Sequence, residues 1–503
     1  MAWGGRLAVL VFLTLAARAA AACWFFERHG AWASHGADIW FFAGAAKGCH
    51  NLFWGDPLRW LLPLAGGFSP ETIYAILWGC SNALNLAAVI ILYFGCREVY
   101  SSAKAAFWAS LAFVLGSSSL NYCTASFHHQ QEVFPVLMLS VWMVLRLMKS
   151  GGWGAGCLLA GLLLLAAGMG PDAGVVAAWL LPLLLERRLT RSIADGPRKR
   201  WIQAGILLGW LALAWCLKPG LVVLHDQMAM HVRGIDLAHQ RQLNAADLLP
   251  FGWSCWWNTY GVFSVLGAGL LVWGWWRDRF AEVSLVVTAG LFAGAAARFS
   301  PWVEMPMAWL LAAFLANEFR EGRQRWMKWA GAIAVTGMFL TACWRGLPCF
   351  YPGNIVAVLK QMPPSGTENA RVLCSPTYGF VIRGVTGAPC VTDWHHLDDR
   401  WIRLASNPLA VALPELRKEG ITHLFFTSDD CRVGVGRTPD GMEAPVLLAS
   451  GGFERALPDD VEDVKASLVW RALAEETLPG LRRLAAQTDR RGRVKAVLWA
   501  VLP

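Results

Sequence analysis

Charged residues are scarce in this sequence. Asp, Glu, Lys and Arg make up only 16% of the 503 residues, whereas 56% are hydrophobic and the mean hydropathy is +0.41. Soluble globular domains carry roughly 25% charged residues. The composition therefore excludes an ordinary soluble enzyme and indicates a membrane protein.

Motifs for metals, redox chemistry and nucleotides are also missing. The 13 cysteines form no C-x-x-C pair and show no Cys/His spacing typical of zinc. The C-terminal part has neither a glycine-rich phosphate loop nor a nucleophile elbow. The sequence thus predicts no certain cofactor, and it leaves any metal unknown.

The net charge of +9 is unevenly distributed along the chain. Residues 345–503 hold 19 basic and 18 acidic side chains, so nearly all of the excess lies in residues 1–344. This distribution is expected of basic cytoplasmic loops and argues against a nucleic-acid partner.

Apolar segments near the ~20 residues that a bilayer requires recur through residues 1–344, and the 29 Trp suit membrane interfaces. The first segment resembles a cleaved signal peptide, but it resumes through Cys23–Phe26, which favours an uncleaved span. We predict a polytopic α-helical membrane protein with about eleven transmembrane helices, at residues 7–26, 73–95, 105–119, 132–148, 153–170, 173–186, 202–218, 260–276, 281–298, 303–318 and 328–344.

The distribution of basic residues predicts the orientation. If the N-terminus is cytoplasmic, 17 of the 25 Lys and Arg in residues 1–344 fall in segments on the cytoplasmic side. The positive-inside rule therefore predicts a multi-pass plasma (inner) membrane protein whose residues after 345 are extracytoplasmic.

Two domains follow from these patterns. Residues 1–344 form the membrane domain, with long outer loops at 27–72 and 219–260, and residues 345–503 form a small soluble α/β domain. An acidic cluster at Asp393–Asp399 is expected to be a solvated loop, with a ligand site as the alternative. In the soluble domain we expect strands at 371–374, 389–392, 421–426 and 494–501, and helices at 410–419 and 464–486.

Asp38 is the principal catalytic candidate. It follows the first apolar segment, which carries Arg18, and it stands among apolar and aromatic residues. A carboxylate at the membrane–water boundary is costly unless it is hydrated or paired, which favours a functional role. The alternative is that Asp38 only caps a short helix beginning at Ile39.

A second candidate site is the segment from Ser126 to Glu132, at the outer mouth of the fourth span. If it is helical, His128 and Glu132 share one face, four residues apart. Such a pair can help to bind a divalent cation. The alternative is that His128 and His129 face lipid headgroups.

Three features resemble the GT-C membrane glycosyltransferases, especially the protein mannosyltransferase-like and aminoarabinose transferase-like branches. The first is an Arg late in the first span followed by an acid in the first outer loop, here Arg18 and Asp38. The second is the segment 297–306, which leads into a late span and contains a basic residue, aromatic residues and two prolines. The third is the sequence motif at 416–424 in the C-terminal soluble domain. The segment around Gly36–Asp38 also resembles polyprenyl-phosphate mannosyltransferases, so neither the branch nor the transferred sugar is predicted.

The resemblance implies an enzyme that uses a polyprenyl-phosphate-linked sugar as donor and an extracytoplasmic acceptor, in contact with membrane lipids. Asp38 would take the acceptor proton, and Glu132 would help to form the catalytic cavity. Cationic side chains would stabilise the leaving phosphate, for which arginine forks are well shaped. The residues expected to contact substrate are Arg18, Lys47, Arg59, His128, His129, Arg233, Arg241 and Arg298.

Two other classes remain open at the level of sequence. A secondary transporter would have a similar number of spans, although paired repeats or broken helices in matching halves are not visible here. A non-catalytic membrane scaffold derived from a GT-C fold is the other alternative. Loss of activity in Asp38→Asn would separate the enzyme from the scaffold.

Overall fold

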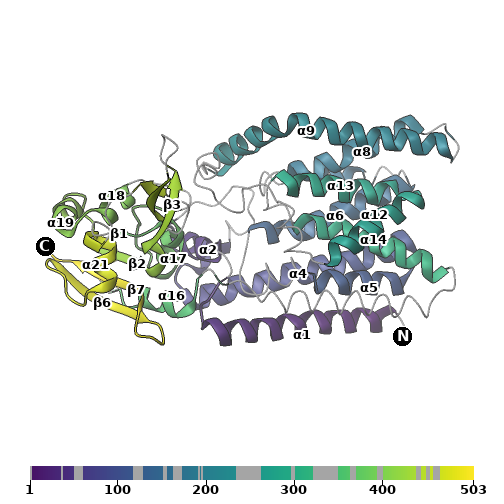
Figure 1. The fold of residues 1–503 in the computed structure, drawn as a ribbon. Helices are drawn as coiled ribbons and strands as arrows, with labels where there is room; N and C mark the ends of the chain where they lie inside the picture. The colour runs from purple at the N-terminus through teal and green to yellow at the C-terminus, as the bar shows by residue number, and fades with distance from the viewer. Residues whose placement is uncertain are drawn as a thin grey trace.

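The structure of the chain, a computed structural model, has a helical bundle at one end and an α/β domain at the other (Figure 1). Within some helices and strands only the backbone is described. The described residues are 3–34, 38–49, 61–116, 129–150, 154, 156–162, 173–190, 193, 196–233, 262–295, 301–320, 349, 351–362, 370–393, 400–437, 443–448, 454–456 and 465–503.

Long apolar helices build the bundle. Their shared core includes Leu92, Tyr93, Phe134 and Trp309, whose close packing holds the helices together through many small van der Waals contacts. The helices are α1 (Trp3–His29), α4 (Pro70–Tyr100), α5 (Ala103–Val114), α6 (His129–Ser150), α8 (Ala173–Thr190), α9 (Pro197–Arg233), α12 (Val262–Trp276), α13 (Phe280–Ala295) and α14 (Pro301–Arg320).

Most of the predicted spans coincide with helices of the bundle. Among the described residues, α1 from Gly4 onward and α4 are long and apolar enough to cross a membrane, judged by length and composition. The predicted span at 328–344 and the domain boundary at 344 lie outside the described residues, and the count of eleven stays a prediction. Helix α9 continues to Arg233, so residues 219–233 of the predicted outer loop at 219–260 are helical. The location of this segment outside the membrane stays a prediction.

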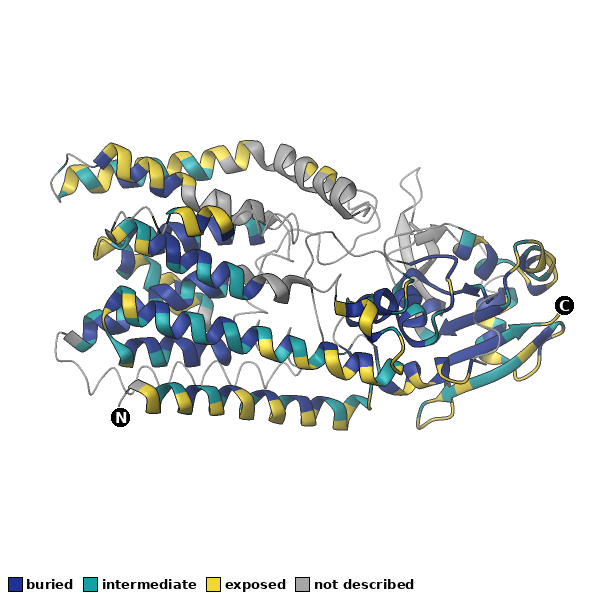
Figure 2. Ribbon diagram, turned by 180° about the vertical axis from the view of Figure 1, so that it is seen from behind, coloured by how far each residue is buried: buried dark blue, intermediate teal, exposed yellow. Residues whose placement is uncertain are grey.

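Apolar side chains also cover much of the outside of the bundle. Figure 2 shows exposed residues recurring along α1 and α9, and they include Phe12, Leu15, Trp201 and Trp215. Large exposed apolar surfaces are unusual on soluble monomers. They are expected where a helix faces lipid.

Polar contacts tie the helices together at the end of the bundle far from the α/β domain. Lys149 Nζ donates to Val99 O at 2.9 Å, Lys199 Nζ lies 3.2 Å from Asp278 Oδ2, and Tyr100 OH donates to Glu282 Oε1 at 3.0 Å. The hydrogen bond between Tyr100 and Glu282 gives two buried polar groups the partners that they need, whereas the contacts of Lys149 and Lys199 lie at the surface.

The α/β domain contains two sheets. The larger sheet has the order β1-β2-β7-β6, in which β1 and β2 are parallel and the other pairs are antiparallel. The smaller antiparallel sheet has the order β3-β4-β5. The strands are β1 (Val372–Leu373), β2 (His423–Thr427), β3 (Arg432–Arg437), β4 (Glu443–Leu448), β5 (Glu454–Ala456), β6 (Leu481–Thr488) and β7 (Val494–Val501). The helical elements are α16 (Gly353–Leu359), α17 (Pro376–Thr386), α18 (Arg400–Ser406), α19 (Leu409–Lys418), the 3-10 turn η5 (Ser428–Cys431) and α21 (Leu468–Ala474).

Alternating side chains of the larger sheet enter two different cores, as the pleat of a strand requires. Phe425 and Leu498 face a core shared with α16, α17 and the first outer loop. Leu424, Phe426 and Trp499 face a second core that contains residues of α18, α19 and α21. The sheet is therefore covered on both faces.

The first outer loop contributes to the core on one face of this sheet. Its two helical elements are α2 (Asp38–Ala46) and the 3-10 turn η1 (Leu62–Ala65). Ile39, Trp40 and Phe42 from α2 are buried in the same cluster as Val381 and Phe425 of the α/β domain. Residues from the two ends of the chain thus share one hydrophobic core.

The structure confirms part of the predicted soluble domain and corrects the rest. The final strand at 494–501 and the helix at 410–419 are confirmed, and Gly420 ends that helix in the left-handed region at φ +66°. The predicted helix at 464–486 is wrong, because α21 stops at Ala474 and β6 begins at Leu481. Pro479 precedes Gly480, whose φ is +72°, and this pair cannot continue a helix. The predicted strand at 389–392 reduces to an isolated bridge between Cys390 and Val372.

Candidate functional site

Several candidate residues lie on elements that meet at one end of the bundle. Lys149 contacts Val99, which brings the ends of α4 and α6 together, and Lys199 at the start of α9 contacts Asp278. Figure 1 shows these helix ends far from the α/β domain. Because these helices span roughly 30 Å or more at 1.5 Å per residue, their other ends face the α/β domain. The backbone therefore brings α2, the start of α6 and the end of α9 to the same end of the bundle.

Asp38 is the first residue of α2, and its side chain is half-buried. The seven other residues of α2 that are buried face the core at the junction with the α/β domain. A carboxylate in the first turn of a helix is stabilised by the positive end of the helix dipole. The position fits both interpretations of Asp38, as a helix-terminal acid and as a base held at the edge of an apolar core.

The segment before α2 is fixed by hydrogen bonds on both sides. Trp40 Nε1 donates to Ser34 Oγ at 3.0 Å, Tyr74 OH donates to Ala33 O at 2.6 Å, and Ser34 pairs with Tyr351 through two backbone hydrogen bonds of 3.0 and 3.2 Å. Trp32 has φ +76°, a conformation that costs about 1–3 kcal/mol for a residue other than glycine. These surrounding contacts hold that turn in place.

Helix α2 packs closely against α17. A Cβ atom at Gly384 would lie 2.6 Å from the Trp40 carbonyl oxygen, so only glycine permits this approach. The rings of Phe41 and Phe380 lie 5.1 Å apart between centroids. The position of Asp38 is therefore set by the α/β domain as well as by the bundle.

Lys47 lies just after the other end of α2, about 13 Å from Asp38 along the helix. Its Nζ donates to Val385 O, near the end of α17, at 2.9 Å. Burial lowers the pKa of Lys47, while Cys49 and Glu71 act in the opposite direction. The ammonium thus ties the end of α2 to α17, and its predicted role at the donor phosphate stays a prediction.

Arg18 lies inside the bundle. Its side chain is 2% exposed, and α1 contacts α4 and α5. It precedes the end of α1 at His29 by about 16 Å along the helix axis. Basic residues at such depth are costly and are typically functional, which keeps Arg18 among the candidates.

The remaining candidates are described partly or not at all. His129 and Glu132 lie in the first turn of α6, and Arg233 is the last residue of α9, but their side chains lie outside the described part of the chain. The other candidates, Arg59, His128, Arg241 and Arg298, lie wholly outside it. Among the described residues, no group of three His, Cys, Asp or Glu side chains has the arrangement of a metal site.

Glu304 is an acid for which the sequence analysis predicted no specific role. It lies in the first turn of α14 and is half-buried, and a Cβ atom at Gly116, just beyond α5, would lie 2.7 Å from its Oε2. The carboxylate is thus held against the end of α5, at the same end of the bundle as α2. An acid at the entry of an apolar helix was the signal that could have identified it.

The prediction of a solvated loop is wrong at Asp393. Its side chain is fully buried, and its Oδ2 lies 2.8 Å from an Nη2 of Arg383, on α17, which is itself nearly buried. A buried carboxylate requires such a partner. Residues 394–399 of the predicted acidic cluster lie outside the described residues.

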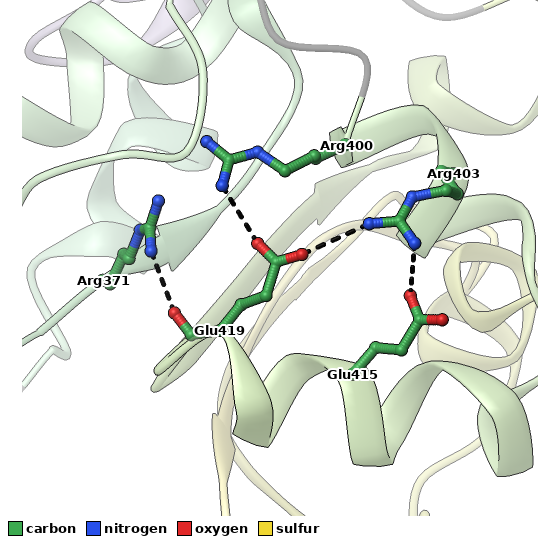
Figure 3. Close-up of polar contacts among 5 residues, drawn as sticks. All are labelled: Arg371, Arg400, Arg403, Glu415 and Glu419. Atoms are coloured by element: carbon green, nitrogen blue, oxygen red, sulfur yellow. Dashed lines mark hydrogen bonds and ion pairs between the residues drawn. The ribbon is translucent and has the colours of Figure 1, made fainter.

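A second group of charges holds α18 against α19 (Figure 3). Glu419 lies 3.2 Å from both Arg400 and Arg403, Arg403 also lies 2.8 Å from Glu415, and Arg371 donates to the Glu419 carbonyl at 2.9 Å. This network lies on the side of the α/β domain away from α2 (Figure 1). Its charges are paired with one another, and we assign it a structural role.

Comparison with known proteins identifies the fold. No protein-family model and no curated protein sequence matches the chain. The archaeal oligosaccharyltransferase AglB from Archaeoglobus fulgidus, solved with an inhibitory peptide and a dolichol-phosphate, is similar over 95% of this chain and 80% of its own, with a TM-score of 0.59 and 12% identity. The chain therefore shares its fold with this oligosaccharyltransferase over most of its length, which agrees with the fold that the sequence resemblance implies and does not single out a particular branch.

Proposed function

We propose that this protein is an integral-membrane glycosyltransferase that moves a sugar from a polyprenyl-phosphate donor to an extracytoplasmic lipid, glycan or protein acceptor. The observation that carries the proposal is the position of Asp38, at the start of a helix held between a GT-C-type bundle and an α/β domain. The solved neighbour contains both a dolichol-phosphate and a peptide, which suits a lipid-linked donor and a separate acceptor.

In this proposal Asp38 is the general base. An acceptor hydroxyl is a weak nucleophile, and a carboxylate within hydrogen-bonding reach can take its proton as the new glycosidic bond forms. The sugar–phosphate bond breaks, and the lipid phosphate leaves with the electron pair. Glu132, at the start of α6, is the second acid of the proposed cavity.

Cations complete the proposed site by stabilising the leaving phosphate. Arg298, in the connection between α13 and α14, and Arg233, at the end of α9, belong to the same end of the bundle as α2 by chain position. Arginine presents two parallel donors to phosphate oxygens, which makes these residues better candidates than Lys47. The other candidates are Arg18, Arg59, His128, His129 and Arg241.

We also propose that the α/β domain is extracytoplasmic. Basic residues, among them Arg97, Lys149, Arg187 and Lys199, lie near the helix ends at the end of the bundle far from the α/β domain (Figure 1). Lys149 contacts Val99, Arg187 contacts Leu147 and Lys199 contacts Asp278, which supports this grouping. The positive-inside rule assigns that end to the cytoplasm. Asp38 would then lie at the outer face, where only lipid-linked sugars serve as donors.

Mass spectrometry of cell-envelope glycolipids and glycoproteins tests the reaction class. Cells that produce the chain should contain a species heavier by one sugar residue than cells that lack it. Restoring the wild-type protein should restore this species, and the mass increment would identify both sugar and acceptor. Identical glycolipid and glycoprotein profiles with and without the chain would contradict a glycosyltransferase.

A further inference from the structure

We infer that the protein docks onto an anionic bilayer surface through two elements near the junction of the bundle and the α/β domain, the apolar turn at 61–68 and the basic turn at 489–493. We call this pair the membrane-docking surface. The apolar turn would enter the boundary between headgroups and acyl chains, and the basic turn would bind lipid phosphates. This inference does not depend on the proposed reaction.

The apolar turn exposes large side chains where the chain enters α4. Leu61, Leu64 and Phe68 are 59%, 79% and 51% exposed, whereas Leu62 and Ala65 between them are buried in the core shared with α2. The turn is thus rigidly packed on one side and presents only apolar groups on the other. Such an element beside a membrane is suited to lie in the interface.

The basic turn joins β6 to β7. The segment 481–501 carries six basic side chains and a single acid, Asp489. Asp489 accepts hydrogen bonds from the backbone N–H of Arg491 and Arg493, and its carboxylate lies 2.8 Å from the Arg493 guanidinium. Arg490 and Arg491 are exposed at the tip, and within the described residues no hydrogen bond or ion pair engages their guanidinium groups. The turn is therefore fixed in shape, and its two free positive charges complement anionic headgroups.

Packing places both turns on the side of the α/β domain that faces the bundle. Leu484 and Ala485 of β6 pack against the same core as Leu62 and Ala65 of the apolar turn. Helix α16 contacts β6 and β7, and Lys360 at its end lies 2.7 Å from Glu71 in the first turn of α4. Figures 1 and 2 both show the β6–β7 turn on the same edge of the molecule as α1.

The adjoining part of α1 marks the level of the bilayer surface. Arg28 lies over the Trp24 ring, 5.5 Å from its centroid, and an amphipathic pair of this kind at the end of an apolar helix is typical of the membrane interface. Phe12 and Leu15 on the same helix are exposed, so the lipid-facing side of α1 leads directly to this level. The membrane-docking surface continues that apolar surface onto the α/β domain.

Site-specific photocrosslinking in lipid tests the inference. The full-length protein would be placed in nanodiscs of equal parts phosphatidylglycerol and phosphatidylcholine, with benzoylphenylalanine at Phe68, at Thr488 beside the basic turn, or at Val411. Val411 is the matched control because it is 51% exposed, as Phe68 is, but lies on α19. We expect lipid adducts at Phe68 and Thr488 and none at Val411.

The composition of the adducts at Thr488 tests the role of charge. Phosphatidylglycerol should be enriched over phosphatidylcholine on the order of fivefold for each arginine that contacts headgroups. Arg490→Gln with Arg491→Gln should abolish this enrichment, whereas Lys418→Gln with Arg482→Gln, an equal loss of charge elsewhere on the domain, should leave it unchanged. Equal adduct yields at Phe68 and Val411, protein rather than lipid adducts at Thr488, or unenriched lipid there would each overturn the inference.

Discussion

Individual charged residues show how this apolar chain uses its few charges. Asp393 and Arg383 form a buried pair inside the α/β domain, whereas Asp489 and Arg493 form an exposed pair in a turn. The sequence marked Asp393 as part of an acidic, solvated loop. It could not reveal the burial, because that depends on an arginine presented by the preceding helix.

Asp393→Asn should destabilise the protein strongly. The substitution keeps the shape of the side chain but leaves the buried Arg383 guanidinium without its counter-charge, which costs about 3–5 kcal/mol. The free energy of unfolding of the α/β domain, measured by chemical denaturation in detergent, would report this loss. Asp489→Asn is the control, since a solvent-accessible ion pair contributes little to stability. Equal effects of the two substitutions would show that the Arg383–Asp393 pair is not buried in solution.

His423 should make the α/β domain sensitive to acid. Burial lowers the pKa of this histidine below its ordinary value of 6.5, and Arg482 lowers it further. The unfolded chain therefore binds the proton more readily than the folded chain. The contribution of His423 to the free energy of unfolding is fully present above pH 6.5 and falls as the pH drops below that value toward the pKa in the folded state.

The measurement compares wild type with His423→Gln. Between about pH 7 and about pH 5, where histidine titrates, the wild-type protein should lose more of its free energy of unfolding than the variant does. Glutamine cannot titrate, so the difference between the two pH dependences isolates this one group. Parallel pH dependences would mean that His423 has the same pKa in the folded and unfolded states.

At the scale of elements, hydrophobic patterns identified helices better than their ends or their partners. The apolar runs marked α1, α4 and α14 within a few residues, and the strand predicted at 494–501 has the bounds of β7. The start of α2 at Asp38 also agrees with the helix expected from Ile39. Its partner was not predictable, because the contact between Lys47 and Val385 joins residues 338 positions apart, and no local pattern encodes it.

Gly384→Ala should loosen the contact between α2 and α17. The added methyl group would meet the Trp40 carbonyl oxygen at 2.6 Å, and relief of such overpacking typically costs about 1–3 kcal/mol. Thermal unfolding of the detergent-solubilised protein should show a lower midpoint. Gly79→Ala in α4 is the matched control, because a methyl group there meets nothing within 4 Å and alanine favours a helix. An unchanged midpoint in Gly384→Ala would contradict the close approach of the two helices.

At the scale of the whole molecule, the two ends of the chain cooperate to hold one short helix. The core that buries Trp40 also contains Tyr351, Val381 and Leu498, so the first outer loop is built into the C-terminal domain. Composition could distinguish the apolar helical part from the less apolar α/β part. Their joining through α2 was not, because it depends on tertiary packing between segments that are distant in sequence.

The proposed orientation predicts the behaviour of topology reporters. A reporter that works only outside the cytoplasm should be active when fused after Pro503 and inactive when fused near Arg191, because this orientation puts the basic helix ends of the bundle in the cytoplasm. A reporter that works only in the cytoplasm should give the opposite pattern. If the fusion after Pro503 proved cytoplasmic, Asp38 would lie on the wrong side for a lipid-linked donor presented outside.

The transfer activity of Asp38→Asn tests the central claim most directly. Asparagine keeps the size and most of the hydrogen bonding of the side chain but cannot accept a proton, so activity should fall by about 10²–10⁴-fold. Asp278→Asn is the matched control, since Asp278 lies at the far end of the bundle with φ +57°, a conformation that asparagine tolerates. With both variants produced at wild-type levels, we predict loss of the glycosylated product in Asp38→Asn alone. Wild-type transfer by Asp38→Asn would contradict the assignment of this residue as the catalytic base.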